Sequence, residues 1–152
     1  MKHSICTALT LALLSGSAAA ATESMQCPAP ENITYENHIY TSPVTLSGWE
    51  GSWNSQVHQQ KDIKRFVTAL YFAKNKLAEG VLVNCTYELA NGQEIDLTYS
   101  RKGKENILSN LIVSIEGNDN WYPESAAKTE RFYDCDKSAD ACGFEPLQTV
   151  NN

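Results

Sequence analysis

The sequence predicts an all-β fold: a small antiparallel β-sandwich or barrel held together by disulfides, with room for one short helix. Three observations support this prediction. Apolar and polar residues alternate in short stretches, turn residues separate these stretches, and four of the five cysteines lie beyond residue 26. Alternation with a period of two is the pattern of half-buried strands, and an even cysteine count is typical of a disulfide framework. The length fits a single β domain over residues 22–152, with an ordered core over residues 26–147.

Residues 1–21 have the layout of a secretory signal peptide. Lys2 precedes an apolar run from Ile5 to Leu14, and small residues follow as far as Ala21. The apolar run is shorter than the ~20 residues that a membrane-spanning helix needs. We therefore expect cleavage after Ala21 and a secreted or periplasmic product without a membrane span, in a compartment where disulfides persist.

The four remaining cysteines predict two disulfides. We favour Cys27 with Cys85, which would tie the amino-terminal arm to the middle of the chain, and Cys135 with Cys142, which would close a short acidic loop. Pairing Cys27 with Cys142 and Cys85 with Cys135 stays open, because it would tie both ends of the domain to the core. No C-x-x-C pair occurs in the sequence, so disulfides explain these residues better than a zinc site does.

The first half of the domain predicts short strands interrupted by turns. Residues 33–40 fit a pair of short strands, and residues 43–53 fit strands bent at glycines. Lys61–Leu77 is ambiguous, because its apolar residues share one helical face and also alternate as a strand over Phe66–Ala73. We place Phe66–Ala73 as a central strand, with a short helix as the alternative.

The second half carries clearer strand signals. Gly80–Leu89 and Glu94–Tyr99 alternate and flank Asn91-Gly92, which is the strongest short signal for a hairpin. Ile107–Ile115 and Arg131–Cys135 are the remaining strand candidates. Six or more short strands with turns between them are typical of a β-sandwich or a barrel.

Several short motifs follow one another in a defined order. They are Cys-Pro-x-Pro at 27–30, Trp-x-Gly at 49–51, Phe66 with Ala69, Gly-x-Leu-x-x-Cys-x-Tyr at 80–87, Tyr-x-Cys at 133–135 and Cys-x-Phe at 142–144. In this order they resemble a family of small secreted bacterial proteins that is defined as a domain of unknown function. The resemblance covers nearly all of the chain after the signal peptide. It implies an exported bacterial domain with paired cysteines, favours a strand over Phe66–Ala73, and implies no activity.

An acidic segment near the carboxyl end has the oxygen spacing of a calcium loop. The oxygens fall at positions 1, 3, 5, 7 and 12 of a twelve-residue frame, on Asp134, Asp136, Ser138, Asp140 and Glu145. Ala139 stands where such loops carry glycine, and two cysteines interrupt the frame. The alternative is a solvated acidic loop closed by a disulfide. We expect no cofactor apart from calcium at this place.

Four aromatic residues are candidates for a binding surface. Trp49 and Trp53 lie four residues apart, and Trp121 is followed by Tyr122. Exposed aromatic rings stack on sugars and anchor protein partners. The alternative is that the tryptophans fill the core of a small β domain.

The charge balance narrows the class of function. The chain has 18 acidic and 12 basic residues and a net charge of −6, which argues against general nucleic-acid binding. No metalloprotease or nucleophile-elbow motif occurs in the sequence, and we assign no catalytic residue. We expect a non-enzymatic binding module for a protein or a glycan. An acidic inhibitor of a basic secreted hydrolase such as lysozyme is the alternative, followed by a small calcium-binding or hydrolytic domain.

Overall fold

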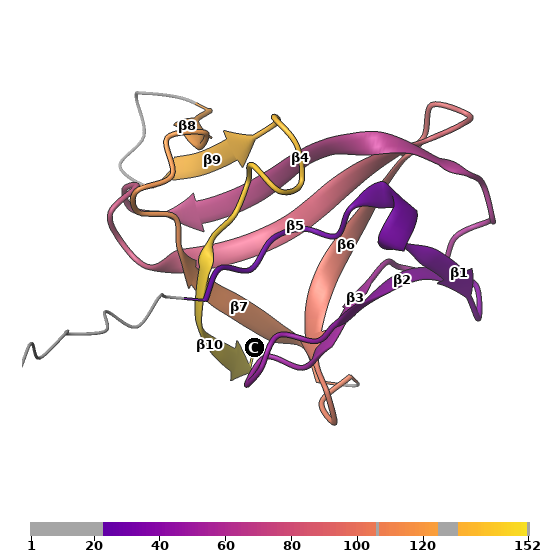
Figure 1. The fold of residues 1–152 in the computed structure, drawn as a ribbon, viewed down its shortest axis with the longest axis horizontal. Coiled ribbons are helices and arrows are strands. Elements are labelled where there is room, and N and C mark those ends of the chain that lie inside the picture. Colours follow the sequence, from indigo (N-terminus) through magenta and orange to yellow (C-terminus); the bar gives the residue numbers. More distant parts are fainter. Residues whose placement is uncertain (1–22, 106, 125–130, 152) are drawn as a thin grey trace, which may run out of the picture.

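Ten strands make up almost all of the regular structure. The computed structural model describes residues 23–105, 107–124 and 131–151, so the predicted signal peptide lies outside the described residues (Figure 1). The strands are β1 (Thr34–Glu36), β2 (Ile39–Val44), β3 (Gly51–Asn54), β4 (Ile63–Ala73), β5 (Gly80–Leu89), β6 (Glu94–Arg101), β7 (Ser109–Ser114), β8 (Tyr122–Pro123), β9 (Arg131–Cys135) and β10 (Glu145–Asn151). Every pairing between these strands is antiparallel.

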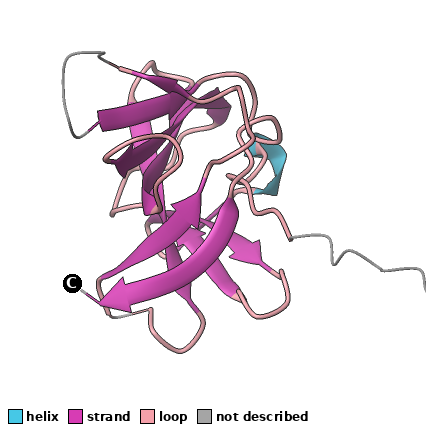
Figure 2. Cartoon of the chain, turned by 90° about the vertical axis from the view of Figure 1, so that its left-hand side faces the viewer, coloured by secondary structure: helices cyan, strands magenta, loops and turns pink. Residues whose placement is uncertain are grey.

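The sheet branches at β5. One edge of β5 pairs with β4, while the other edge is shared, with residues 80–82 against β7 and residues 85–88 against β6. One branch continues through β6, β3, β2 and β1, a second runs from β7 to β10, and β4 leads to β9 and β8. Seen from the side, the strands form an upper and a lower group (Figure 2). β5 is therefore the strand on which the rest of the fold is organised.

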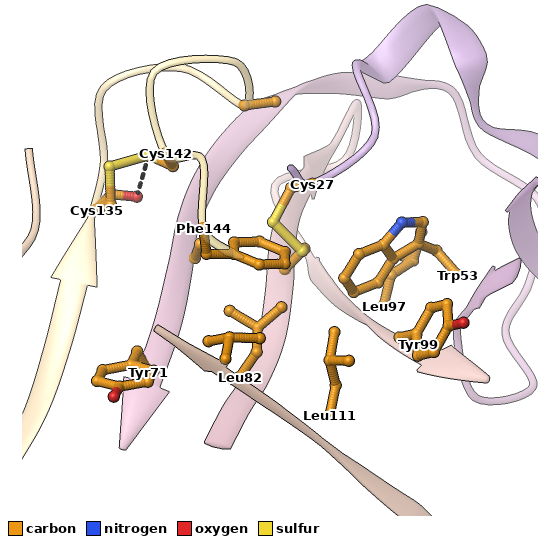
Figure 3. Close-up of a cluster of buried hydrophobic side chains, with 14 of the residues drawn as sticks. Cys27, Trp53, Tyr71, Leu82, Leu97, Tyr99, Leu111, Cys135, Cys142 and Phe144 are labelled. Carbon is orange, nitrogen blue, oxygen red and sulfur yellow. Dashed lines mark hydrogen bonds between the residues drawn. A yellow bond between two sulfur atoms is a disulfide. The ribbon is translucent and has the colours of Figure 1, made fainter. Parts of the chain in front are cut away.

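The core consists of residues on the inner face of the sheet, and on β5 the alternation shifts by one residue between Leu82 and Cys85, where the pairing with β4 is irregular. On β5, Leu82, Cys85 and Tyr87 are buried, and on β4, Tyr71 is fully buried. Figure 3 shows the centre of this core, where the following side chains gather: Trp53, Tyr71, Leu82, Leu97, Tyr99, Leu111 and Phe144. The Tyr87 hydroxyl donates a hydrogen bond of 2.6 Å to the carbonyl of Pro28, so the buried polar group is satisfied.

Two disulfides fasten the chain to this core. Cys27 is bonded to Cys85, and Cys135 is bonded to Cys142, which is the pairing favoured on sequence grounds. The first bridge spans 58 residues and joins the amino-terminal arm to β5, whereas the second spans 7 residues and closes a loop after β9. The two bridges are consistent with an oxidising compartment. Among the described residues, no helix is long and apolar enough to cross a membrane.

The all-β, disulfide-linked antiparallel fold predicted from the sequence is confirmed. The sheet is open, because its path ends at β1 and β8 without closing into a barrel. Phe66–Ala73 lies within β4 and is a strand, and the helical structure in the described part of the chain is one 3₁₀ turn over Pro30–Asn32. Asn91-Gly92 forms the turn between β5 and β6, with Gly92 at a φ of +82°.

One detail differs from the sequence prediction, and two were not predicted. Residues 45–50 form a loop between β2 and β3, so Trp49 does not lie on a strand. The turn between β1 and β2 consists of Asn37 and His38, both at positive φ without a glycine. The sequence gives no signal for β10, which continues to Asn151 because it pairs with β7. Of these three details, β10 is the one that a pairing partner distant in the chain defines.

Candidate functional site

An acidic pocket lies where the amino-terminal arm meets the end of β7 and the segment before β10. It has a volume of about 360 Å³. Its lining includes four acidic residues from three separate segments: Glu23, Glu116, Asp140 and Glu145. None of the described residues lining the pocket is Lys, Arg or His. A pocket with this lining presents negative charge without a countercharge of its own, which favours a cationic group.

A hydrogen-bonded loop forms one wall of the pocket. The Cys135–Cys142 disulfide closes this loop at its base. The Asn118 side-chain amide donates to the carbonyls of Ala141 and Gly143 at 3.0 and 2.9 Å, and the Trp121 indole N–H donates to Gly143 at 3.3 Å. These contacts hold the loop against the segment that follows β7, so the two walls of the pocket are fixed relative to each other.

The amino-terminal arm forms the third wall. Met25 and Phe144 exchange two backbone hydrogen bonds of 2.8 and 2.9 Å, which place Ser24 beside Gly143. A Cβ atom added at Gly143 would lie 2.9 Å from the Ser24 hydroxyl oxygen, so glycine permits this close approach. The arm is thus held between the Cys27 disulfide and this short bridge.

Asp140 is held in its charged form. The Ser138 hydroxyl donates to its Oδ1 at 2.5 Å, and the backbone N–H groups of Asp140 and Ala141 also contribute. These donors lower the pKa of Asp140 below its ordinary value, the Ser138 hydroxyl having the largest effect. The carboxylate is exposed, so its negative charge is accessible to solvent or to a partner.

Comparison with known proteins gives one match. The family model described as "Protein of unknown function (DUF3757)" matches residues 21–145, which is most of the chain. The chain belongs to this family. No curated protein and no solved structure matches it.

A second acidic group in this DUF3757 chain lies on the outer face of β8 and β9. Asp134 is half-buried on β9, Glu124 follows β8, and Asp136 follows β9. Burial raises the pKa of Asp134, and the nearby Glu124 carboxylate raises it further, although the Thr68 hydroxyl opposes these effects by donating at 3.3 Å. The pKa of Tyr122 is also raised, first by burial and then by its contact with Asp136.

The structure distributes the five residues of the calcium frame over three places. Asp134 faces Thr68 on the sheet, Ser138 bonds to Asp140 in the disulfide loop, and Glu145 begins β10 opposite Ser114. Among the described residues, no group of three or more His, Cys, Asp or Glu side chains is placed to hold a metal ion. Asp140 and Glu145 share the acidic pocket, and Asp134 and Asp136 belong to the second acidic group.

The four candidate aromatic residues divide between core and surface. Trp53 and Trp121 are core residues, with exposed fractions of 3% and 2%. Trp49 is half-buried on the loop between β2 and β3, with the Arg101 guanidinium 5.5 Å from its ring centroid. Tyr122 is 43% exposed. Two of the four rings therefore serve packing and have no free face for stacking on a sugar.

Sequence reasoning missed half of the acidic pocket in this family member. Asp140 and Glu145 belong to the predicted acidic segment, whereas Glu23 lies in the arm and Glu116 follows β7. The chain carries 18 acidic residues, and no motif distinguishes these two from the others. The Met25 bridge, the Asn118 contacts and the pairing of Glu145 with Ser114 bring their segments together.

Proposed function

We propose that the chain is an exported, non-enzymatic binding domain that accepts a basic side chain of a protein partner in the acidic pocket. The observation that carries this proposal is the lining of the pocket, which includes four acidic residues and, among the described lining residues, no cation. The net charge of −6 favours encounter with a basic partner over the whole surface. An exported product follows from the signal-peptide layout of residues 1–21 and agrees with the two disulfides.

The rigidity of the pocket supports specific binding. The loop that carries Asp140 is closed by a disulfide and held by the Asn118 and Trp121 hydrogen bonds. A wall that is ordered before binding loses less conformational entropy when a partner arrives. The Lys or Arg side chain of the partner would meet an already charged Asp140 carboxylate.

Inhibition of a basic secreted hydrolase such as lysozyme is the second candidate function. The preorganised acidic loop supports it, because an ordered charged loop binds an oppositely charged surface at a lower cost in conformational entropy. A glycan partner has less support, since the buried rings of Trp53 and Trp121 offer no stacking face.

A basic polar peptide, Lys-Lys-Ser-Thr-Ser-Lys-Lys, tests the pocket directly. We expect the protein to bind it more weakly as salt rises, and we expect the triple variant Glu116→Gln, Asp140→Asn, Glu145→Gln to reduce its affinity about tenfold. The matched control removes the same charge at exposed carboxylates elsewhere, through Glu31→Gln, Glu36→Gln and Glu94→Gln. Equal losses in the two variants would show that the charge of the whole surface, and not the pocket, attracts the peptide.

Lysozyme tests the second candidate. If the chain is an inhibitor, a molar excess of the protein lowers the rate of cell-wall lysis, and the pocket variant restores it. If the protein bound the peptide but had no effect on lysis, the proposed binding function would stand and the inhibitor function would be contradicted.

A further inference from the structure

One apolar row crosses the outer face of the sheet on four neighbouring strands. Phe132 on β9 lies opposite Phe72 on β4, Phe72 opposite Val81 on β5, and Val81 opposite Ile112 on β7. The two phenylalanine rings are in contact, with centroids 4.8 Å apart, and Phe132 is 37% exposed. The other three side chains are half-buried. The row is continuous because each member is the register partner of the next.

This row is not needed for the core. The neighbouring residues Tyr71, Leu82, Val113 and Tyr133 point inward and are buried, so the core on these strands is complete without it. An antiparallel sheet with one face in solvent normally carries polar residues on that face. Elsewhere this face carries polar residues such as the hydrogen-bonded pair Thr86 and Asp96. The half-buried Leu70 on β4, opposite Asp134, is a further apolar residue on the same face.

Acidic groups border the row at two opposite corners. Asp134 lies two residues beyond Phe132 along β9, with the Glu124 carboxylate near it. At the other corner, Ser114 lies two residues beyond Ile112 along β7 and pairs with Glu145, which lines the acidic pocket. The row therefore lies between the acidic pocket and the second acidic group.

We propose that this outer face docks a basic protein partner whose apolar side chains cover the Phe132–Ile112 row while its flanking Lys or Arg side chains meet the two acidic corners. The proposal rests on the proposed function, in that the acidic pocket becomes one end of a larger interface. Charge complementarity selects this occupant. A second copy of the chain would bring another net charge of −6 against the first, so self-association is disfavoured.

Two peptides of equal charge separate the row from the pocket. The polar peptide Lys-Lys-Ser-Thr-Ser-Lys-Lys reports on the acidic sites alone, whereas Lys-Lys-Leu-Val-Leu-Lys-Lys adds an apolar centre of strand length. We expect the oxidised protein to bind the apolar peptide at least fivefold more tightly than the polar one. We expect Phe132→Thr to remove that difference and to leave the polar peptide unaffected, since threonine keeps the β preference of the strand.

A control and a second variant keep the test independent of folding. Val57→Thr removes an exposed apolar side chain from the loop between β3 and β4 and should change neither affinity. Ile112→Thr, at the opposite end of the row, should act as Phe132→Thr does. Each variant is compared with the parent by near-ultraviolet circular dichroism.

Each other outcome contradicts a defined part of the proposal. Equal affinity for the two peptides, or an apolar preference that survives Phe132→Thr and Ile112→Thr, overturns docking on the row and leaves the acidic pocket as the binding site. Failure to bind either peptide overturns both the row and the proposed function. A dimer in sedimentation equilibrium that Phe132→Thr dissociates would assign the row to a second copy and overturn the basic partner.

Discussion

The two disulfides lie in two regions that we expect to contribute differently to stability and to the shape of the acidic pocket. All four cysteines are fully buried, yet the Cys27–Cys85 bridge spans 58 residues and the Cys135–Cys142 bridge spans 7. The first joins the amino-terminal arm to the strand on which the sheet branches. The second closes a surface loop that presents Asp140. A bridge that closes a longer loop restricts the unfolded chain more, so we expect the first region to contribute more to stability and the second to hold the shape of the site.

Removing the long bridge is expected to have the largest effect. For a closed loop of 58 residues, chain entropy gives a loss of about 4 kcal/mol in the double variant Cys27→Ala, Cys85→Ala. Urea denaturation of this variant and of the parent measures the difference. A loss no larger than that of the short bridge would break the comparison, because it would show that the arm contributes little to the free energy of unfolding.

Removing the short bridge is expected to cost less stability and more binding. For a loop of 7 residues the same relation gives about 2 kcal/mol in Cys135→Ala, Cys142→Ala. The loop then loses its closure, so Asp140 is no longer fixed beside Glu116 and Glu145. We expect the basic polar peptide to bind about as weakly as to the triple charge variant, measured by calorimetry. Unchanged affinity would show that the Asn118 and Trp121 hydrogen bonds suffice to shape the pocket.

A contrast between local and long-range contacts also separates the features that the sequence predicts from those that it does not. Alternation and the Asn91-Gly92 turn predict β5 and β6, because their signals are local. β10 lacks such a signal and forms by pairing with β7. The acidic pocket likewise depends on contacts between distant segments, so Asp140 and Glu145 are found from the acidic segment, whereas Glu23 and Glu116 are not.

The apolar row shows the same limit on the sheet. The sequence predicts Phe72 and Val81 to be ordinary strand residues, but it does not predict which face of the sheet either side chain occupies. Only the register, which pairs Phe132 with Phe72 and Val81 with Ile112, aligns them across four strands. Local periodicity predicts that strands exist, while the residues that meet across strands follow from the topology.

Removing the Tyr87 hydroxyl tests how much one hydrogen bond to the amino-terminal arm contributes to stability. Tyr87→Phe leaves the buried carbonyl of Pro28 without its 2.6 Å hydrogen bond, and we expect a loss of about 1–2 kcal/mol in urea denaturation. Tyr35→Phe is the matched control, because the Tyr35 hydroxyl donates at 2.7 Å to the carbonyl of His58 at a less buried position. We expect the control to lose less. Equal losses would mean that the deeper burial of the Tyr87 hydrogen bond does not increase its contribution to the free energy of unfolding.

The smallest expected effect distinguishes the two acidic regions by the sign of their response to pH. The pKa of Asp134 is raised above its ordinary value of 3.8, so its contribution to stability is present at low pH and is lost as the pH rises through its pKa in the folded protein. Asp134→Asn should therefore raise the free energy of unfolding at pH 7, by roughly half a kcal/mol or less at this half-exposed position. The gain should vanish below pH ~3, where the wild-type carboxyl is protonated in both states.

Asp140 should respond in the opposite sense. Its pKa is lowered, so its contribution is present at neutral pH and is lost as the pH falls through its pKa in the folded protein. Asp140→Asn should then reduce stability at pH 7 and have no effect in strong acid. Urea denaturation across this pH range measures both variants. If Asp134→Asn also reduced stability at pH 7, burial and the Glu124 charge would not be what governs Asp134. If Asp140→Asn instead raised stability at pH 7, the Ser138 hydrogen bond would not stabilise the Asp140 carboxylate in the folded protein.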